Sequence, residues 1–316
     1  MDVVDFEPYR RDLTGYCYRM LGSIHDADDA VQDTMLRAWQ GWAGFSGESS
    51  VKTWLYRIAT NRCIDHLRQR SRRMPMELSG PFPPDVVPGQ SLPAEHWIEP
   101  AADRDLLPDG LDPVELVVLR DSVRLAFITL LQHLPARQRA VFILREVLSW
   151  RADEVARLLK VSIAAVNSAL ARARATLEQD RANDPALAAI DDLDDQRLLA
   201  RYVEAFEHYD IDALVALLDE DASMSMPPLL MWFKGRKDLK AFHLGTGVHC
   251  QGSVLLPVAM NGSPGFGQYL APDASGRRQP WAIQVLDRAP GRILHVYNFL
   301  DTSLFARFGL PAYLDA

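Results

Sequence analysis

The sequence is poor in cysteine and lacks any long uninterrupted apolar run. Its three cysteines, Cys17, Cys63 and Cys250, are odd in number, far apart and set among apolar residues. We therefore expect reduced core thiols and no disulfide or metal framework. No segment approaches the roughly 18 apolar residues of a membrane span, and the segment MDVVDFEPYRRD lacks the basic-then-apolar order of a signal peptide. These features predict a cytoplasmic protein with no membrane partner and no bound cofactor.

Positive charge is also scarce, but it is concentrated in two segments. The chain has 34 basic and 42 acidic side chains, a net charge of −8. Residues 1–73 hold 11 basic and 10 acidic side chains, and residues 122–179 hold 9 and 4. Residues 74–121 hold 2 and 10, and residues 180–316 hold 12 and 18. Because phosphate binding requires clustered positive charge, only the first and third segments are candidates for contact with nucleic acid.

Helical patterns fill the first basic segment, residues 5–73. Apolar side chains recur on one side of a helix at Val31, Met35, Ala38 and Trp42. The segment GFSGESS, residues 44–50, interrupts the pattern. A second long helix is predicted over residues 51–70, with inward candidates Leu55, Ile58 and Leu67.

The rest of the chain divides into a linker, a second helical segment and an α+β segment. Residues 74–113 contain nine prolines, many acids and no apolar period, which predicts an extended linker, partly disordered. Helical patterns resume over 113–181 and again over 193–218. After that, the apolar runs SVLLPVAM, PWAIQVL and ILHVYNF are separated by turn residues, which is typical of strands.

A helix-turn-helix is predicted within the second basic segment. Ser149 is a candidate N-cap for a helix over 151–159, and Ser162 for one over 163–177. In the latter, Val166, Leu170, Ala173 and Leu177 fall on one face. Asn167 on another face is suited to pair with adenine, and Arg172 and Arg174 to reach phosphates. The alternative is a plain helical hairpin with a solvated basic face.

Both basic segments resemble bacterial sigma factors of the extracytoplasmic-function group. The first reads DADDAVQDTMLRAWQGWAGFSGESSVKTWLYRIATNRCIDHLRQRSRR, and the second LPARQRAVFILREVLSWRADEVARLLKVSIAAVNSALARARATL. The resemblance implies a multidomain chain with two all-α modules, region 2 over residues 5–74 and the region 4 helix-turn-helix over 114–181. Residues 75–113 form the linker. Lys160 departs from the family, which usually has glycine at this position, where positive φ is often needed.

The resemblance also implies partners and site residues. Core RNA polymerase, through its β′ and β subunits, and promoter DNA are the expected partners. Contact with the polymerase is assigned to Asp28, Asp29, Gln32, Asp33 and Arg37. Reading of the −10 element is assigned to Phe45, Ser46, Tyr56, Asn61, Arg62, Arg68 and Arg72. Reading of the −35 element is assigned to Ser162, Ala164, Ala165, Asn167, Ser168, Arg172 and Arg174.

Simpler explanations exist for several of these residues. Asp28 and Asp29 lie in a first helical turn, where acids complement the helix dipole. Trp39, Trp42 and Trp54 are equally compatible with a plain core role, which we favour for Trp54. Phe45 lies in the loop and is the better candidate for stacking on an unpaired base.

The last segment resembles SnoaL-like, cone-shaped α+β domains over residues 198–308. The resemblance implies a regulatory domain over 190–316 with an apolar pocket, edged by Met224, Met226, Trp232, Trp281, Tyr297 and Phe299. His295 with Asp301 is the nominated catalytic pair if the domain is an enzyme. We favour a role without catalysis, because neither residue lies in a motif specific for catalysis and because such a fold says little about activity.

These features predict an alternative sigma factor, not an enzyme, whose C-terminal domain contacts and regulates the sigma modules. One rival is an ordinary helix-turn-helix repressor or activator, which leaves the first basic segment unexplained. The other is a helix-turn-helix DNA-binding protein fused to a SnoaL-type small-molecule enzyme.

Overall fold

The computed structural model describes residues 4–69, 80–85, 91–93, 96–108, 110, 112–181 and 192–315. The chain divides into two compact units, each assembled from two separate stretches of sequence. Unit 1 comprises Met1–Arg73 and Asp103–Asn183, and unit 2 comprises Met74–Ala102 and Asp184–Ala316. The two basic segments therefore share one unit, and the predicted linker divides, with residues up to Ala102 in unit 2 and those from Asp103 in unit 1.

Three helices form the first part of unit 1: α1 (Arg10–Leu21), α2 (Ile24–Gly41) and α3 (Val51–Gln69). The left-handed residue Gly22 ends α1, and Ser23 starts α2 by accepting a hydrogen bond from the Asp26 amide at 3.1 Å. Val31 and Ala38 are fully buried, and so is Leu55 on α3. The predicted inward faces are thus confirmed in part, because Met35, Trp42, Ile58 and Leu67 are only half-buried. The bounds of α3 are nearly those predicted.

The second part of unit 1 runs from the short α4 (Asp103–Leu106) to the helix-turn-helix. It contains α5 (Pro113–Asp121), α6 (Leu125–His133), α7 (Ala136–Phe142), a π-helical turn (Ile143–Val147), α8 (Ala152–Leu159) and α9 (Ile163–Arg181). Lys160, which ends α8, has the positive φ of 55° expected for its position. The Ser162 hydroxyl caps α9 by accepting from the Ala165 amide at 3.1 Å.

The predicted cap of α8 is wrong. Ser149 has a φ of 56° and lies outside the helix, whose N-cap is Arg151. The Arg151 amide donates to the Glu154 carboxylate at 2.8 Å. A residue in the helix therefore supplies the acceptor at this end, in place of the serine hydroxyl.

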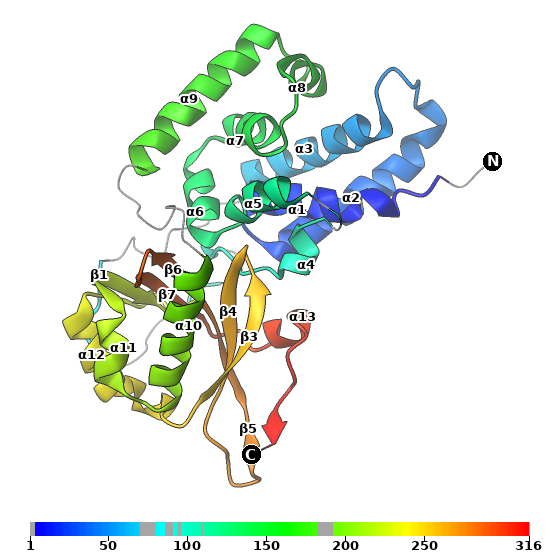
Figure 1. Ribbon diagram of the computed structural model, residues 1–316. Coiled ribbons are helices and arrows are strands. Elements are labelled where there is room, and N and C mark those ends of the chain that lie inside the picture. Colours follow the sequence, from blue (N-terminus) through cyan, green and yellow to red (C-terminus); the bar gives the residue numbers. More distant parts are fainter. Residues whose placement is uncertain are drawn as a thin grey trace. The chain divides into compact units, whose positions relative to one another are not determined.

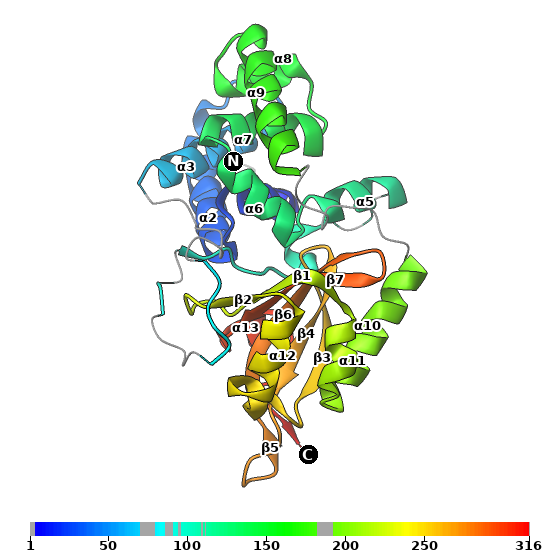
Figure 2. The ribbon, with the colours of Figure 1, turned by 90° about the vertical axis from the view of Figure 1, so that its left-hand side faces the viewer.

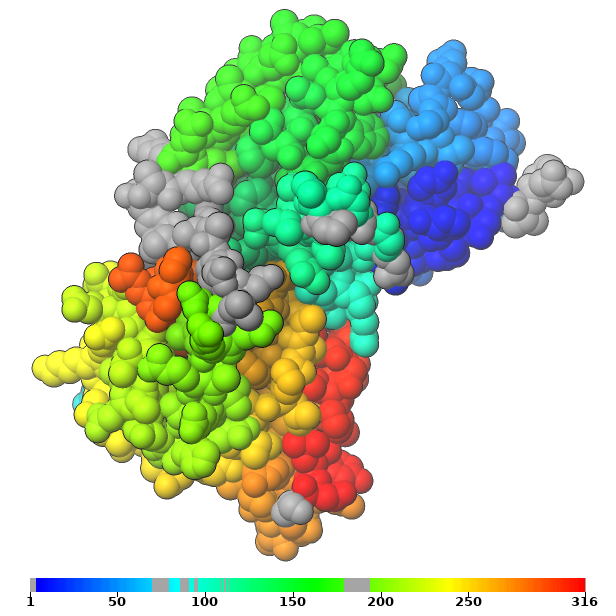
Figure 3. Space-filling model, in the orientation of Figure 1, coloured from blue at the N-terminus to red at the C-terminus, as the bar shows by residue number. Residues whose placement is uncertain are grey.

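The two parts of unit 1 pack directly on each other (Figure 3). The buried Arg19 of α1 donates to the Ser122 hydroxyl from Nε at 3.0 Å and from Nη2 at 2.8 Å. Arg139 of α7 donates to the Met20 carbonyl. Gly15 permits a close approach of α4, because a Cβ there would lie 2.5 Å from the Leu106 carbonyl oxygen.

Unit 2 is an α+β domain, as predicted, built on a six-stranded sheet of order β2-β1-β7-β6-β4-β3. β1 and β7 pair in parallel, and the other neighbours are antiparallel. The strands are β1 (Leu218–Ser225), β2 (Trp232–Lys234), β3 (Val254–Met260), β4 (Ser263–Tyr269), β6 (Pro280–Ala289) and β7 (Arg292–Phe299). β5 (Arg277–Arg278) and β8 (Leu314–Asp315) form a separate small pair.

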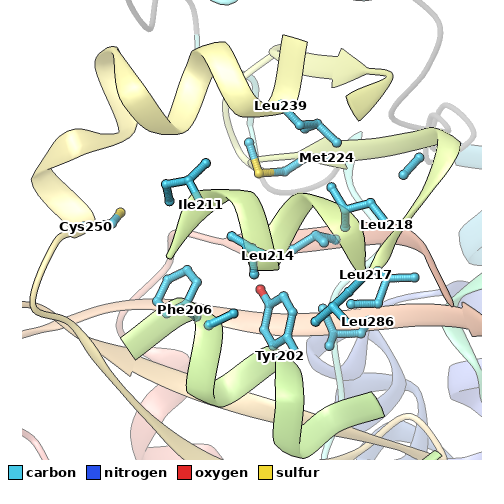
Figure 4. Packing of buried hydrophobic residues seen from close by; sticks show 14 of the residues in the cluster. Tyr202, Phe206, Ile211, Leu214, Leu217, Leu218, Met224, Leu239, Cys250 and Leu286 are labelled. Carbon is cyan, nitrogen blue, oxygen red and sulfur yellow. The ribbon is translucent and has the colours of Figure 1, made fainter. Parts of the chain in front are cut away.

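Helices cover one face of this sheet (Figures 1 and 2). They are α10 (Asp192–Glu207), α11 (Ile211–Ala216) and α12 (Arg236–Leu244), followed by a 3-10 turn (Thr246–Cys250). Their apolar side chains form the core against the sheet, with Tyr202 and Leu214 facing Leu286 (Figure 4). The short α13 (Leu304–Arg307) packs on β6. The single helix predicted over 193–218 is instead two, divided near Tyr209, which has a φ of 56°.

The described part of the linker packs on unit 2. Ala101 donates to the Asn261 side-chain oxygen at 2.8 Å, and Asn261 donates back to the Ala101 carbonyl at 3.0 Å. The Phe82 amide donates to the Trp232 carbonyl at 2.8 Å. Trp97 and Ile98 are buried. These described residues of the predicted linker therefore have defined contacts with unit 2.

Candidate nucleic-acid interface

The exposed face of α9 brings together the seven residues predicted to read the −35 element. Val166, Leu170 and Ala173 are buried toward the rest of the helix-turn-helix. The opposite face is open to solvent along the helix and presents Ser162, Ala164, Ala165, Asn167, Ser168, Arg172 and Arg174. Its first turn contains two alanines, Ala164 and Ala165, and small side chains there allow the backbone to approach base edges in a major groove.

Positive charge on this face is partly neutralised within the unit. Arg174 pairs with Glu146 at 2.8 Å, although half of its side chain stays exposed. Arg172 is exposed on the same helix. Arg172 is therefore the better placed of the two arginines for a phosphate contact.

An aromatic cluster holds the loop between α2 and α3. Phe45 stacks on Trp42 with ring centroids 5.1 Å apart and lies 5.0 Å from Trp54. Trp54 is only 8% exposed, so its predicted core role is confirmed. Phe45 is half-buried, and Ser46 beside it is exposed. The loop thus retains a partly open aromatic ring next to a hydroxyl.

Tyr56 does not offer a stacking surface in this arrangement of unit 1. Its side chain is 1% exposed, and its ring lies 5.0 Å from that of Trp150. Burial raises the pKa of its hydroxyl well above the ordinary value. Its assignment to base reading is therefore corrected for unit 1 as it is packed here, because Trp150 covers the Tyr56 ring.

Two residues assigned to different surfaces pair with each other. Arg62 of α3 forms an ion pair with Asp33 of α2, and Asp33 also pairs with Arg37 at 3.2 Å. Asp33 and Arg62 thus join α2 to α3 and are not independent binding groups. Of the other residues predicted to read the −10 element, Asn61 is exposed, Arg68 is exposed and pairs with Asp65 at 3.3 Å, and Arg72 lies outside the described residues.

The exposed face of α2 carries an unexpected apolar end. Asp29 and Gln32 are exposed as predicted, and Asp28 is half-buried. One and two further helical turns along lie Leu36 and Trp39, which are 52% and 66% exposed. Asp29, Gln32, Leu36 and Trp39 form the α2 stripe. Sequence reasoning missed its apolar half because Trp39 was grouped with the core tryptophans, although its spacing from Gln32 marks the outer face.

Unit 2 has a small, partly open cavity between its helices and its sheet. Its volume is about 30 Å³, enough for roughly two water molecules. The expected edges Met224, Met226 and Trp281 do line it, together with Asn298. Trp232, Tyr297 and Phe299 do not. The two-residue period of β7 places Val296 and Asn298 on the cavity side instead of Tyr297 and Phe299. Trp232 of β2 pairs with Ser225, which lies on the other face of β1 from Met224.

Several polar side chains at this cavity hydrogen-bond to one another. The Tyr202 hydroxyl donates to Gln284 at 3.0 Å, Gln284 donates to Gln268 at 3.0 Å, and Gln268 donates to the Ser253 hydroxyl at 3.2 Å. His243 also lines the cavity, and burial lowers its pKa to about 4. The imidazole is therefore neutral at physiological pH.

The nominated catalytic pair does not form. His295 lies between two hydroxyls, with Ser223 Oγ at 2.5 Å from Nδ1 and Ser225 Oγ at 2.7 Å from Nε2. Burial lowers its pKa to about 3. Asp301 instead accepts from the amide and hydroxyl of Ser303 in an exposed turn. His295 is a buried, hydrogen-bonded residue of the sheet.

Comparisons with known proteins agree on both helical segments. The family model for Sigma-70 region 2 matches residues 6–73, and that for Sigma-70, region 4 matches residues 124–177. The chain is 45% identical over 312 residues to the ECF RNA polymerase sigma factor SigG of Mycobacterium tuberculosis. The alignment covers 96% of this chain and 82% of SigG. It is 28% identical to SigJ of the same organism, over 71% of this chain and 64% of SigJ.

A solved structure extends the likeness to the whole fold. The crystal structure of Mycobacterium tuberculosis SigJ matches with a TM-score of 0.62 and 22% identity, covering 98% of this chain and 100% of that chain. At this identity the likeness concerns the fold alone. Among the described residues, no helix is both long and apolar enough to cross a membrane.

Proposed function

Since the chain belongs to the extracytoplasmic-function sigma factors of RNA polymerase, we propose specific surfaces for its contacts with polymerase and promoter. The protein is an alternative sigma factor that directs promoter-specific initiation by binding core polymerase and promoter DNA. In our proposal the α2 stripe docks on the polymerase, the α2–α3 loop and α3 read the −10 element, and α9 reads the −35 element. The single observation that carries the proposal is the exposed face of α9, open above a buried Val166 and Leu170.

The function itself is tested by run-off transcription. Core polymerase supplemented with this protein is expected to initiate at discrete sites in a genomic promoter library. Core polymerase alone, or the protein alone, is expected to yield no such products. Absence of specific starts, with binding to DNA retained, would support the simple helix-turn-helix regulator instead.

For the polymerase contact, we propose Trp39 as the anchor and Asp29 as the charged guide. A large exposed aromatic is the side chain most often found at interface hot spots, and an acid suits a basic partner surface. Trp39→Ala is expected to weaken the affinity for core polymerase at least tenfold. Asp29→Lys is expected to weaken it as well, in a salt-dependent manner.

Glu178→Lys is the charge-matched control, because Glu178 is exposed on α9 away from the α2 stripe. Asp33 is unsuitable for this test, since its ion pair with Arg62 joins α2 to α3. Unchanged core affinity in Trp39→Ala, measured by titration with circular dichroism confirming the fold, would remove α2 from the interface.

For promoter reading, we propose that Asn167 pairs with an adenine and Arg172 contacts a phosphate. Asn167→Ala is expected to relax preference at one −35 position at a cost of about 1–3 kcal/mol. Arg172→Ala is expected to weaken all sequences alike and to reduce the salt dependence. If both variants shift every site equally, α9 is docked differently from this proposal.

Promoter binding requires unit 1 to open, in this proposal. The −10 and −35 elements are about 25 base pairs apart, roughly 85 Å along B-DNA at about 3.4 Å per pair. In unit 1, α3 instead packs against α7 and α8, and Trp150 covers Tyr56. The closed unit 1 is thus a form that does not bind both elements at once.

We further propose that unit 2 regulates the sigma modules through the linker, without catalysis. Two observations support this role: the reciprocal hydrogen bonds of Ala101 and Asn261, and the position of His295 between the hydroxyls of Ser223 and Ser225, while Asp301 bonds to Ser303. Asn261→Ala is expected to change the run-off yield severalfold, in either direction. Ser275→Ala, in an exposed turn, is the control. Equal yields from wild type and Asn261→Ala across a concentration series would exclude regulation through this contact.

A further inference from the structure

An isoleucine lies exposed at the start of α9. Ile163 is the first residue of the helix, and 48% of its surface is accessible. It directly follows the cap Ser162 and precedes two exposed alanines. We propose that Ile163 selects thymine in the −35 element by contacting the C5-methyl group. This inference rests on the proposed role of α9 as the recognition helix.

Packing does not account for Ile163. The buried side of α9 is complete without it, because Val166, Leu170, Ala173 and Leu177 supply its contacts with the rest of unit 1. Helix formation does not account for it either, since a β-branched side chain is a weaker helix former than its alanine neighbours. An exposed isoleucine at this position therefore costs helix stability and contributes little to the core.

Contact with DNA gives the side chain a partner. The N-terminal residues of a recognition helix contact base edges, and thymine alone presents a methyl group in the major groove. Asn167 lies one helical turn further along α9, so the two side chains leave the helix about 6 Å apart. Because base pairs are stacked about 3.4 Å apart, Ile163 and Asn167 read base pairs no more than about two positions apart. The selected thymine lies within about two positions of the adenine read by Asn167.

Uracil tests the methyl contact without changing any hydrogen bond of the base pair. Each thymine of the −35 element, on either strand, is replaced singly by uracil in promoter fragments that share one −10 element. Binding of the holoenzyme to each fragment is measured for wild type, Ile163→Val and Ile163→Ala. Val117→Ala is the matched control, because Val117 is another exposed branched residue, on α5.

The wild-type holoenzyme is expected to lose about fourfold in affinity at one thymine position, the effect of one buried methyl group. Ile163→Ala is expected to bind the thymine and uracil fragments with equal affinity. The ratio of the two affinities is expected to be intermediate in Ile163→Val and unchanged from wild type in Val117→Ala. Equal ratios in wild type and Ile163→Ala, or a −35 element without thymine, would overturn the inference. Failure of the recognition helix itself would appear separately, as an unchanged base preference in Asn167→Ala.

Discussion

The hydroxyl of Ser122 joins the two parts of unit 1 through the buried Arg19. Its hydroxyl accepts two hydrogen bonds from the buried guanidinium of Arg19, and the Leu119 carbonyl accepts a third at 3.4 Å. Burial lowers the pKa of Arg19 only to about 10, so the side chain is charged at neutral pH. Ser122→Ala leaves this buried charge with the long Leu119 contact. Because a hydrogen bond to a charged group contributes about 1.5–3 kcal/mol, we expect the closed form to lose about 3 kcal/mol.

Arg19→Met is expected to cost less than Ser122→Ala, because it removes the charge together with its need for partners. Resonance energy transfer between dyes on cysteines introduced at Gln40 and Glu178, both exposed, reports the closed form along a urea series. The three native cysteines are buried and free. Thr129→Ala is the control, because its hydroxyl bonds only within α6, to the Leu125 carbonyl.

The transfer signal in Ser122→Ala is expected to disappear at a lower urea concentration than in wild type or Thr129→Ala. An unchanged midpoint, or a larger shift in Arg19→Met than in Ser122→Ala, would refute the reasoning. The first result would mean that other contacts hold unit 1 closed. The second would mean that the guanidinium is worth more as a donor than it costs as a buried charge.

Three further predictions concern stability, each measured on the full chain. Gly15→Ala is expected to lower the melting temperature of unit 1 by several degrees, because the new Cβ would lie 2.5 Å from the Leu106 carbonyl oxygen. Lys160→Gly is expected to raise it by a few degrees, since glycine adopts the φ of 55° without strain. Burial lowers the pKa of His243 to about 4 and of His295 to about 3. As the pH falls, these histidines are protonated in the unfolded chain before they are protonated in the folded chain. The free energy of unfolding is therefore expected to be highest above pH 6.5 and to decline toward pH 4. Urea midpoints at pH 7 and pH 4.5 check the sign, and His295→Gln is expected to reduce the difference.

Local signals made the helix-turn-helix predictable. The cap at Ser162 and the buried stripe from Val166 are properties of short sequence windows. The positive φ at Lys160 is expected only from the family resemblance. The short apolar runs separated by turn residues, which predict strands in unit 2, are a local signal of the same kind. The parallel pairing of β1 with β7 joins segments far apart in sequence, and no local pattern specifies it.

The features that could not be predicted depend on distant parts of the chain. Trp39 and Trp54 both lie in helices with apolar neighbours, yet only tertiary packing leaves the first exposed and the second buried. Tyr56 is covered by Trp150, which follows much later in the sequence. The linker has no apolar period, yet Trp97 is buried and backbone hydrogen bonds join the linker to strand and loop residues of unit 2.

The position of the linker in unit 2 changes the meaning of any truncation. The chain passes between the units at 73/74, 102/103 and 183/184, so the C-terminal domain is not an appendage attached at one point. Cutting after α9 would remove the core against which Phe82 packs and the Asn261 side chain to which Ala101 donates, and would expose the apolar side chain of Phe82. The shortened protein would gain an aggregation-prone loop between its two DNA-reading modules. A separately expressed domain starting at residue 190 would lack a native segment that bonds to both edge strands of its sheet, at Trp232 of β2 and Met260 of β3.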